Sequence, residues 1–468
     1  MNADMNSNMN SLIIEKSIPI GQSYDLVVCG GGPAGVPAAL AAGRAGLKVL
    51  LVERTGQLGG VAVSCGVSVF LGYRSGDKKR WVGGIFEEIV QALIATGGAV
   101  DPLTFREEKY PPFGWYPGLA RGIPFEPSAA AVLMDEKVRA AGVDVLLFTS
   151  FVDVVKAEDL VTHIVIHNKS GLQAVPAKAV VDATGDADVA ARAGCEVVKG
   201  REEDGLMTPA TLIFFVDRVD RDELSSYIYR HKSPRFRELI RSLREKGEWT
   251  FPYEIFISFQ VMDDDVFMIN TLRLCDVDGT EADSLTRGMM AGRQEVQELF
   301  ALMKEYFPGF ANARIRWVAP MIGVRETRRI VGDYVLTIDD IVSGITFPDT
   351  IGFSVYGWDL PDPKKPSYQP MSGKKIARKN PFTPIPYRVM TPRPVKNIIC
   401  PGRAVSVQRH VLGPLRVMAP CFAMGEAAGL AAVQVTEKGI PFREIDIQQL
   451  QERLKENGAI LDEDSARS

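Results

Sequence analysis

A run of glycines between two apolar stretches is the part of this sequence with the clearest chemical potential. An apolar run over 24–29 leads into Gly-Gly-Gly-Pro-Ala-Gly, and an Ala-rich stretch follows. In a GxGxxG turn the first glycine permits a tight turn, the second lets the backbone approach a pyrophosphate, and the third lets a helix pack on the sheet. The residues predicted to contact a dinucleotide here are Gly30, Gly32, Pro33, Ala34 and Gly35.

Glu53 closes the second apolar run, about 20 residues beyond the glycines, as expected for a dinucleotide-binding unit. Its carboxylate can accept hydrogen bonds from a ribose and would repel a phosphorylated ribose. The helix that begins near Gly35 would direct its positive end at the phosphates. A glycine-rich turn without a ligand is the alternative, but strand, turn, helix, strand and acid occur here in the expected order.

The segment after Glu53 reads Arg-Thr-Gly-Gln-Leu-Gly-Gly and resembles the FAD-dependent oxidoreductases of the glutathione reductase superfamily. In that superfamily a basic residue and a later Gly-Gly line the FAD, which implies FAD as the cofactor. The resemblance assigns this role to Arg54, Gly59 and Gly60.

Two later segments extend the resemblance. The run VVDATGDADVAARAG over 180–194 is similar to the second FAD fingerprint, and 397–432 is similar to the closing segment, where Gly-Arg approaches the flavin and a helix of small residues follows. Asp186 could equally do no more than cap a helix over 187–193. The resemblance implies that a strand near Val152 contacts adenine. The further FAD-contacting residues that it implies are Val152, Thr184, Gly185, Asp186, Gly402, Arg403 and Gly425.

Two absences in the sequence narrow the branch of the superfamily. Cys65 alone follows the Gly-Gly, so the dithiol chemistry of disulfide reductases is excluded, and no second GxGxxG indicates a separate NAD(P)H domain. The remaining pattern resembles the branch of the fumarate reductase and succinate dehydrogenase flavoproteins. It resembles most the group called FAD-dependent oxidoreductases, through 320–336, 385–392 and the Gly-Arg segment.

Four residues are candidates for substrate binding or acid-base chemistry. His410 and Arg409 follow the Gly-Arg segment, where the chain should pass the flavin ring, and the alternative for His410 is a structural hydrogen bond. Arg325 lies in a cluster of arginines suited to carboxylates, but pairing with Glu326 or Asp333 is as plausible. Tyr387 lies in a segment that resembles the family's approach to the flavin ring, which implies a hydrogen-bond donor there. Cys65 is expected to be neither a flavin attachment point nor a redox thiol.

The expected fold class is α/β, with a Rossmann-like FAD-binding domain of three layers (β/β/α) and an inserted α+β substrate domain. Helices are expected over 221–230, 234–246 and 283–307, and strands over 253–261 and 266–274. The loops 110–127 and 361–386 could act as lids or be solvated linkers. The predicted division is a disordered leader at 1–22, FAD-binding segments at 23–205 and 385–457, a substrate domain at 206–384 and a flexible tail at 458–468.

Composition excludes several classes of function. A net charge of −4 without a basic run argues against nucleic-acid binding, and six cysteines without a CxxC pair argue against a metal site or disulfide framework in a protein taken to be cytoplasmic. The apolar stretch 417–435 is expected to be a buried helix and no integral membrane segment.

The sequence therefore predicts an FAD-dependent oxidoreductase that transfers a hydride between a small organic substrate and flavin N5. The sequence does not identify the electron acceptor. The alternatives are a flavin subunit that exchanges electrons with a partner protein, or a protein with a structural FAD. Homo-oligomerisation is left open.

Overall fold

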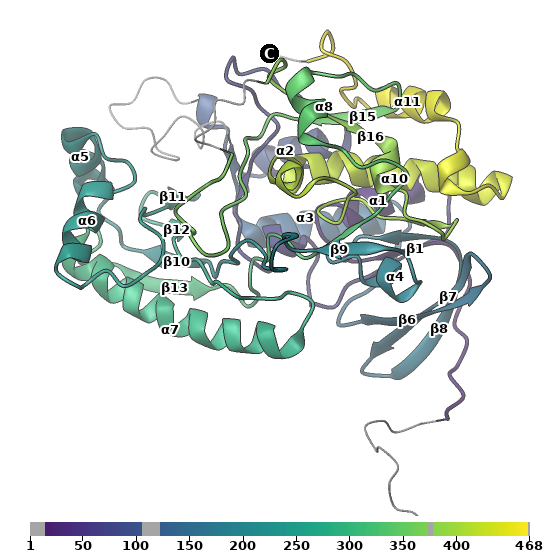
Figure 1. Ribbon diagram of the computed structural model, residues 1–468, viewed down its shortest axis with the longest axis horizontal. Coiled ribbons are helices and arrows are strands. Elements are labelled where there is room, and N and C mark those ends of the chain that lie inside the picture. The colour runs from purple at the N-terminus through teal and green to yellow at the C-terminus, as the bar shows by residue number, and fades with distance from the viewer. Residues whose placement is uncertain (1–14, 105–121, 372–377, 467–468) are drawn as a thin grey trace, which may run out of the picture.

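A central sheet organises the first domain. The computed structural model describes residues 15–104, 122–371 and 378–466, and within these ranges the sheet has seven strands (Figure 1). Its parallel strands lie in the order β5 (Asp144–Leu146), β2 (Val49–Val52), β1 (Tyr24–Cys29), β8 (Gly171–Asp182) and β17 (Ile398–Ile399). The strands β1 and β2 are almost wholly apolar, as expected for a parallel sheet that is covered on both faces.

The long strand β8 belongs to two parts of this sheet. Its second half pairs in parallel with β1, whereas its first half pairs antiparallel with β7 (Leu160–Asn168), which in turn pairs with β6 (Ser150–Ala157). This meander covers one face together with α4 (Asp188–Arg192) (Figure 1). The other face is covered by α1 (Gly35–Arg44), α2 (Gly84–Ala95), α3 (Pro127–Ala140) and α10 (Met418–Lys438). The predicted β/β/α layers are confirmed.

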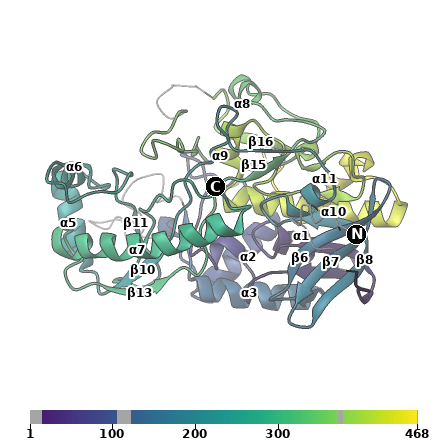
Figure 2. The ribbon, with the colours of Figure 1, turned by 60° about the horizontal axis from the view of Figure 1, so that its bottom comes forward.

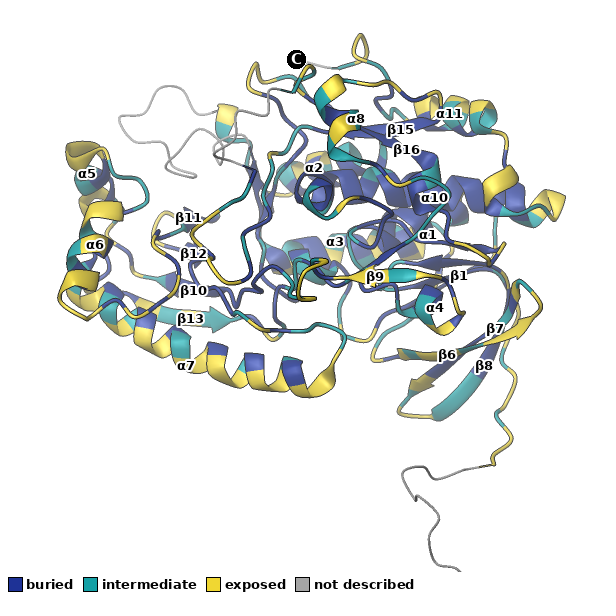
Figure 3. Cartoon of the chain, viewed as in Figure 1, coloured by how far each residue is buried: buried dark blue, intermediate teal, exposed yellow. Residues whose placement is uncertain are grey.

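Helix α10 is the buried centre of the helical layer. A Cβ atom on Gly425 would lie 2.0 Å from the carbonyl oxygen of Ala34, and one on Gly429 would lie 2.2 Å from that of Ala38, so the two glycines let α10 pack directly on α1. By length and composition α10 could cross a membrane, but 94% of its apolar window is buried inside the protein (Figure 3). It is therefore a core helix of this structure.

The second domain is built on a separate antiparallel sheet with its own core. The strands lie in the order β11 (Ser258–Gln260), β12 (Phe267–Ile269), β10 (Phe214–Asp217) and β13 (Arg314–Val318). The helices are α5 (Arg221–His231), α6 (Arg237–Glu245) and α7 (Ala282–Tyr306), and α7 lies across the sheet (Figure 2). The three predicted helices are confirmed, whereas both predicted strands are shorter than expected because the chain leaves the sheet on either side of β11 and β12.

The second domain ends earlier than the predicted boundary at 384. Apart from Val69, its core consists of residues from Ala210 to Ile322, whereas Leu336 and Ile351 belong to the core of the first domain. The entering segment β9 (Val197–Lys199) and the leaving segment β14 (Arg328–Ile330) pair with each other, which marks where the insertion begins and ends. The first domain is completed by β3 (Val69–Phe70), β4 (Ile123–Pro124), α8 (Ile338–Ser343), β15 (Thr350–Ser354), β16 (Thr383–Pro386), α9 (Leu412–Leu415) and α11 (Ile447–Glu456).

Both ends of the described chain are more ordered than the sequence predicts. Ile460 and Leu461 are buried, at 3% and 9% exposure, so the predicted flexible tail is wrong for its first residues. In the predicted leader, Gly21 donates a backbone hydrogen bond of 2.8 Å to Ala174 at the edge of the sheet, whereas residues 1–14 lie outside the described ranges. Most of the first predicted lid and the centre of the second, 105–121 and 372–377, also lie outside them.

Candidate active site

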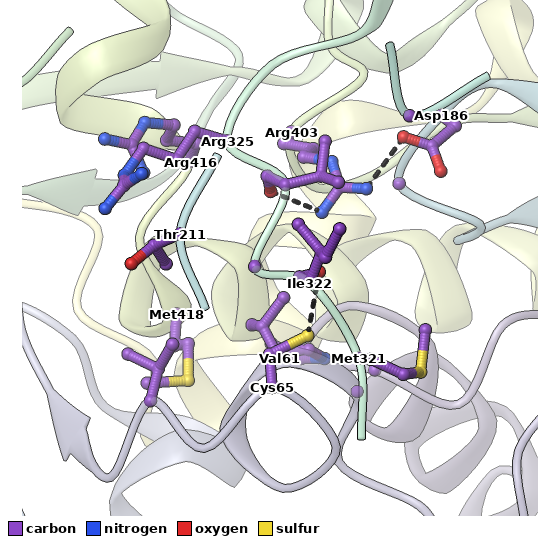
Figure 4. A pocket seen from close by; sticks show the side chains of 18 of the residues that line it. Val61, Cys65, Asp186, Thr211, Met321, Ile322, Arg325, Arg403, Arg416 and Met418 are labelled. Atoms are coloured by element: carbon purple, nitrogen blue, oxygen red, sulfur yellow. Dashed lines mark hydrogen bonds and ion pairs between the residues drawn. The ribbon is translucent and has the colours of Figure 1, made fainter. Parts of the chain in front are cut away.

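One cavity of about 820 Å³ extends from the glycine-rich turn of the first domain to the sheet of the second. Its volume lies towards the upper end of the range of about 300–1,000 Å³ that is usual for ligand sites. Figure 4 shows side chains from both domains pointing into it. Within the described residues, no three His, Cys, Asp or Glu side chains gather as a metal site would require.

The three motif glycines have different neighbours. Gly30 has a φ of +107°, and a Cβ there would lie 2.3 Å from the carbonyl oxygen of Ala183. A Cβ on Gly35 would lie 1.7 Å from the carbonyl oxygen of Gly30, so Gly35 is needed for packing and does not line the cavity. Gly32 lines the cavity with open space beside it, since the nearest atom to its Cβ position is 3.8 Å away. The open position is the one where a pyrophosphate could approach the backbone.

Glu53 is held in place before any ligand arrives. One of its carboxylate oxygens accepts a 2.7 Å hydrogen bond from the backbone N–H of Gly31, and the other accepts bonds of 2.8 and 2.9 Å from the N–H and Oγ1 of Thr55. The buried carboxylate also lines the cavity, so its remaining lone pairs can serve a ribose. Pro33, Ala34, Arg54 and Gly60, which are also predicted to contact the cofactor, line the cavity.

Two predicted cofactor residues next to these have other roles. Gly59 does not line the cavity; its N–H donates a 2.8 Å bond to the carbonyl oxygen of Gly31 and so joins the two loops. Val152 is 39% exposed and lies outside the lining, where Ser150 and Phe151 stand instead. The adenine contact is predicted for Val152 or its neighbour, and at this point of β6 the neighbours line the cavity.

The second and third motifs meet through an ion pair. Asp186 accepts a 2.7 Å bond from Arg403 and a 2.6 Å bond from Thr327 Oγ1, and Thr184, Gly185, Asp186 and Gly402 line the cavity together with Arg403. Burial would lower the pKa of Arg403, but the Asp186 carboxylate more than offsets this effect and the pKa is raised. The alternative role of Asp186 as a helix cap is wrong, because Ala187 holds the N-cap position.

The end of the cavity at α10 differs in one respect from the prediction. Val417 and Met418, at the start of the helix, line the cavity, so the positive end of the helix opens onto it. Gly425 lies about two turns further on and packs against Ala34 instead of lining the cavity. Its predicted role as a cofactor contact is therefore replaced by close packing of two helices.

Of the four candidates for catalysis, only Arg325 lines the cavity. Tyr387 is 2% exposed and its hydroxyl donates a 2.9 Å bond to the carbonyl oxygen of Phe442, so it cannot serve as a donor to the ring. His410 is half-buried outside the lining, and burial followed by the charge of Arg409 lowers its pKa. Neither residue is placed to exchange a proton with a molecule in the cavity.

Arg409 belongs to a buried ionic cluster beside the cavity. Its guanidinium donates two bonds of 2.8 Å to the carboxylate of Glu326, which is fully buried. Glu326 also accepts bonds from Arg329 at 3.1 Å and from the N–H of Thr208 at 2.8 Å. The predicted alternative, in which these arginines pair with Glu326 or Asp333, is therefore confirmed for Arg329. The ionic cluster around Glu326 also joins the start and the end of the second domain to the first domain.

Cys65 lines the cavity as a neutral thiol. Its Sγ donates a 3.3 Å bond to the carbonyl oxygen of Ile322, as Figure 4 shows, and burial raises its pKa to about 11. A thiol with so high a pKa is a poor nucleophile, because the thiolate is the reactive form.

Side chains far apart in the sequence form the opposite end of the cavity, and no motif marks them. Arg273 follows β12, Arg416 follows α9, and Asp359 follows β15. Asp359 accepts a 3.0 Å bond from Arg416 and a 2.8 Å bond from Gln369. The sequence signal available for Arg273 and Arg416 was an arginine next to a predicted loop, and such arginines are too common to identify a site.

The fold is thus a three-layer domain of the dinucleotide-binding type that shares one cavity with a second domain. The model of the FAD dependent oxidoreductase family matches residues 25–454. The chain belongs to this family.

Two curated relatives match short parts of this chain. The chain is 44% identical to the dihydrolipoyl dehydrogenase of Trypanosoma brucei brucei over 54 residues, which is 12% of this chain and 11% of that protein. It is 33% identical to the thioredoxin reductase of Ureaplasma parvum serovar 3 over 86 residues, or 18% and 28% of the two chains. The matches thus span less than a third of these curated relatives.

Similar solved structures include a geranylgeranyl bacteriochlorophyll reductase-like protein from Thermoplasma acidophilum, with 16% identity, a TM-score of 0.48, and coverage of 93% of this chain and 84% of that one. Another is the p-nitrophenol 4-monooxygenase of Pseudomonas putida, with 12% identity, a TM-score of 0.45, and coverage of 92% and 84%.

FAD is the cofactor of this family, and the cavity has features that fit it. The open backbone at Gly32 suits a pyrophosphate, the fixed carboxylate of Glu53 suits a ribose, and the start of α10 suits a carbonyl edge that gains negative charge. When bound, FAD supplies a ring nitrogen that can accept or donate a hydride.

Proposed function

We propose that this protein transfers a hydride between a small organic substrate and the N5 atom of FAD. It would exchange the electrons with a second redox partner, which accepts them or supplies them according to the direction of the reaction. The observation that carries the proposal is the continuity of the cavity: the lining that includes Gly32 and Glu53 also includes Tyr253 and Arg273 of the second domain. A cofactor bound along the first domain would therefore share a wall with a molecule bound against the second.

The second domain contributes placement and exclusion of water. Ile255, Ile257, Phe259 and Met268 form an apolar wall of the cavity. Such a wall favours an organic substrate and strengthens polar interactions by keeping water away.

Few groups at the end of the cavity formed by Arg273, Arg416 and Asp359 can transfer a proton. Tyr253, Tyr356 and Asp359 line the cavity there, and no described histidine does. The charge of Asp359 is favoured, because Arg416, Gln369, Arg325 and Arg273 lower its pKa although burial would raise it. We assign Asp359 the part of a base and the tyrosines the part of hydrogen-bond donors.

We place the chain in the branch that resembles the fumarate reductase and succinate dehydrogenase flavoproteins. The order of the three FAD motifs and the single insertion between the second and third support this placement.

Anaerobic reduction of the purified holoenzyme tests the proposed reaction. The flavin absorption would be followed during titration with NADH, NADPH and a panel of small hydroxy and carboxylic acids. Bleaching by one organic compound, with conversion of that compound, is the expected result. Bleaching by dithionite or a reduced partner protein, and by no organic compound, would favour the electron-transfer alternative and contradict the proposal.

A further inference from the structure

Three arginines line the cavity around the carboxylate of Asp359. Arg273, Arg325 and Arg416 come from three separate segments and all line the cavity. Figure 4 shows Arg325 and Arg416 in the same part of it, away from the Arg403–Asp186 pair. Burial lowers the pKa of Arg325, and the charges of Arg273 and Arg416 lower it further, which reflects how close the three side chains lie.

The cluster has more positive than negative charge. Of the described carboxylates that line the cavity, Glu53, Asp186 and Asp188 belong to the dinucleotide-binding end, which leaves Asp359. Asp359 pairs with Arg416 at 3.0 Å. Three guanidinium groups therefore face one carboxylate.

The other contacts of these arginines are with neutral groups. Arg325 donates a 2.6 Å bond to the carbonyl oxygen of Pro209. Arg273 donates bonds of 2.8 and 3.1 Å to backbone carbonyl oxygens and lies 4.0 Å from the centre of the Tyr253 ring. The Nε atoms of Arg273 and Arg416 are buried with no hydrogen-bond partner among the described residues. Carbonyl oxygens and an aromatic face orient the cations but do not neutralise them.

We propose that Arg273, Arg325 and Arg416 form the binding site for the carboxylate group of an organic acid. Guanidinium groups match the two oxygens of a carboxylate and form charge-assisted hydrogen bonds with it. The apolar wall of Ile255, Phe259 and Met268 next to them fits a substrate with an apolar body. The inference rests on the proposed function, since it identifies this acid as the substrate class.

Calorimetric titration of the holoenzyme measures this site without requiring turnover. The probes are benzoate, phenylacetate and hexanoate, each compared with its own neutral amide, which has nearly the same shape. We expect at least one acid to bind tenfold or more tightly than its amide. The inference is overturned when no acid binds more tightly than its amide, or when inorganic phosphate binds and no carboxylate does.

Variants then locate the site. Arg325→Met should weaken binding of the acid about tenfold or more without changing binding of its amide, and Arg325→Lys should recover part of the loss. The control is Arg287→Met, an exposed residue of α7 outside the cavity lining, which should change neither affinity. Unchanged binding of the acid to a folded, FAD-loaded Arg325→Met protein would contradict the assignment.

The carboxylate site and hydride transfer can each be refuted without the other. Acids that bind through the arginines although no compound reduces the flavin would leave the carboxylate site intact and refute hydride transfer. A neutral compound that reduces the flavin, combined with equal binding of acids and amides, would support hydride transfer and refute the carboxylate site.

Discussion

The two ends of the cavity are built in different ways. At the dinucleotide-binding end, a short stretch of backbone around Gly32 and the carboxylate of Glu53 are positioned by one strand-helix-strand unit. At the opposite end, Arg273, Arg325 and Arg416 meet only because the second domain packs onto the first. The first end can therefore be recognised from local spacing, whereas the second depends on the tertiary structure.

The difference also separates two kinds of selectivity. The backbone turn and Glu53 suit a pyrophosphate and an unphosphorylated ribose, groups that many dinucleotide cofactors share. In the proposed carboxylate site, the arginines and their apolar wall would recognise what is particular to a substrate. Members of one family can thus keep the first end and change the second.

We expect the largest loss of stability from a substitution at the junction between the two domains. Glu326→Gln removes the fully buried charge that pairs with Arg329 and Arg409, so two buried cations lose their partner. We expect the free energy of unfolding to fall by about 3–5 kcal/mol, measured by urea denaturation. The exposed Glu456→Gln of α11 is the matched control and should change it by less than about 0.5 kcal/mol. A loss below about 1 kcal/mol for Glu326→Gln would show that the cluster does not hold the domains together.

Two glycines of the turn should respond oppositely, which sharpens the account of the dinucleotide-binding end. Gly35→Ala places a Cβ 1.7 Å from the carbonyl oxygen of Gly30 and should lower the unfolding free energy of the apoprotein by about 2–3 kcal/mol. Gly32→Val projects into open space, so the apoprotein should keep its stability while its FAD content falls at least tenfold. The ratio of flavin to protein after purification and a denaturation curve measure both effects. Full flavin content in Gly32→Val would contradict the proposed path of the pyrophosphate.

The opposite end can be probed by removing its carboxylate. Asp359→Asn eliminates the negative charge that faces the three arginines, so an incoming carboxylate would meet less repulsion. We expect the affinity for the tightest-binding acid of the panel to rise about three- to tenfold, with no change for its amide, by calorimetry. A weaker affinity for the acid would mean that Asp359 orients the arginines more than it competes with the ligand.

The smallest effect is expected at a residue that the sequence placed near the flavin and the structure places away from it. Tyr387→Phe removes the 2.9 Å hydrogen bond to Phe442 and should cost about 1 kcal/mol of stability. The rate of flavin reduction should stay within about twofold of the unmodified protein in stopped-flow measurements. A rate loss of tenfold or more would restore Tyr387 as a participant in the reaction.

Local sequence patterns predicted the elements that depend on neighbours in the chain. The turn at Gly30, the strand that leads to Glu53 and the long helix α7 follow from spacing that acts within a few residues. The layers of the first domain followed from the order of its motifs. Thr184, Gly185 and Arg403 were found because their motifs resemble those of a family.

Long-range packing explains the predictions that were wrong. Gly425 looked like a ligand contact because small residues suit both ligands and close helices, and only the position of Ala34 decides between them. Tyr387 and His410 lie near the Gly-Arg motif in the sequence or the family pattern, but their side chains turn away from the cavity. Arg273 and Arg416 carry no local signal, because their neighbours come from other segments of the chain.

A crystal structure of the protein with FAD and the tightest-binding carboxylate tests the central claim most directly. The account predicts the pyrophosphate at Gly32, the flavin ring between Gly402 and the wall of the second domain, and the carboxylate on the three arginines. A flavin ring that fills the arginine end, or a carboxylate bound outside the shared cavity, would contradict it.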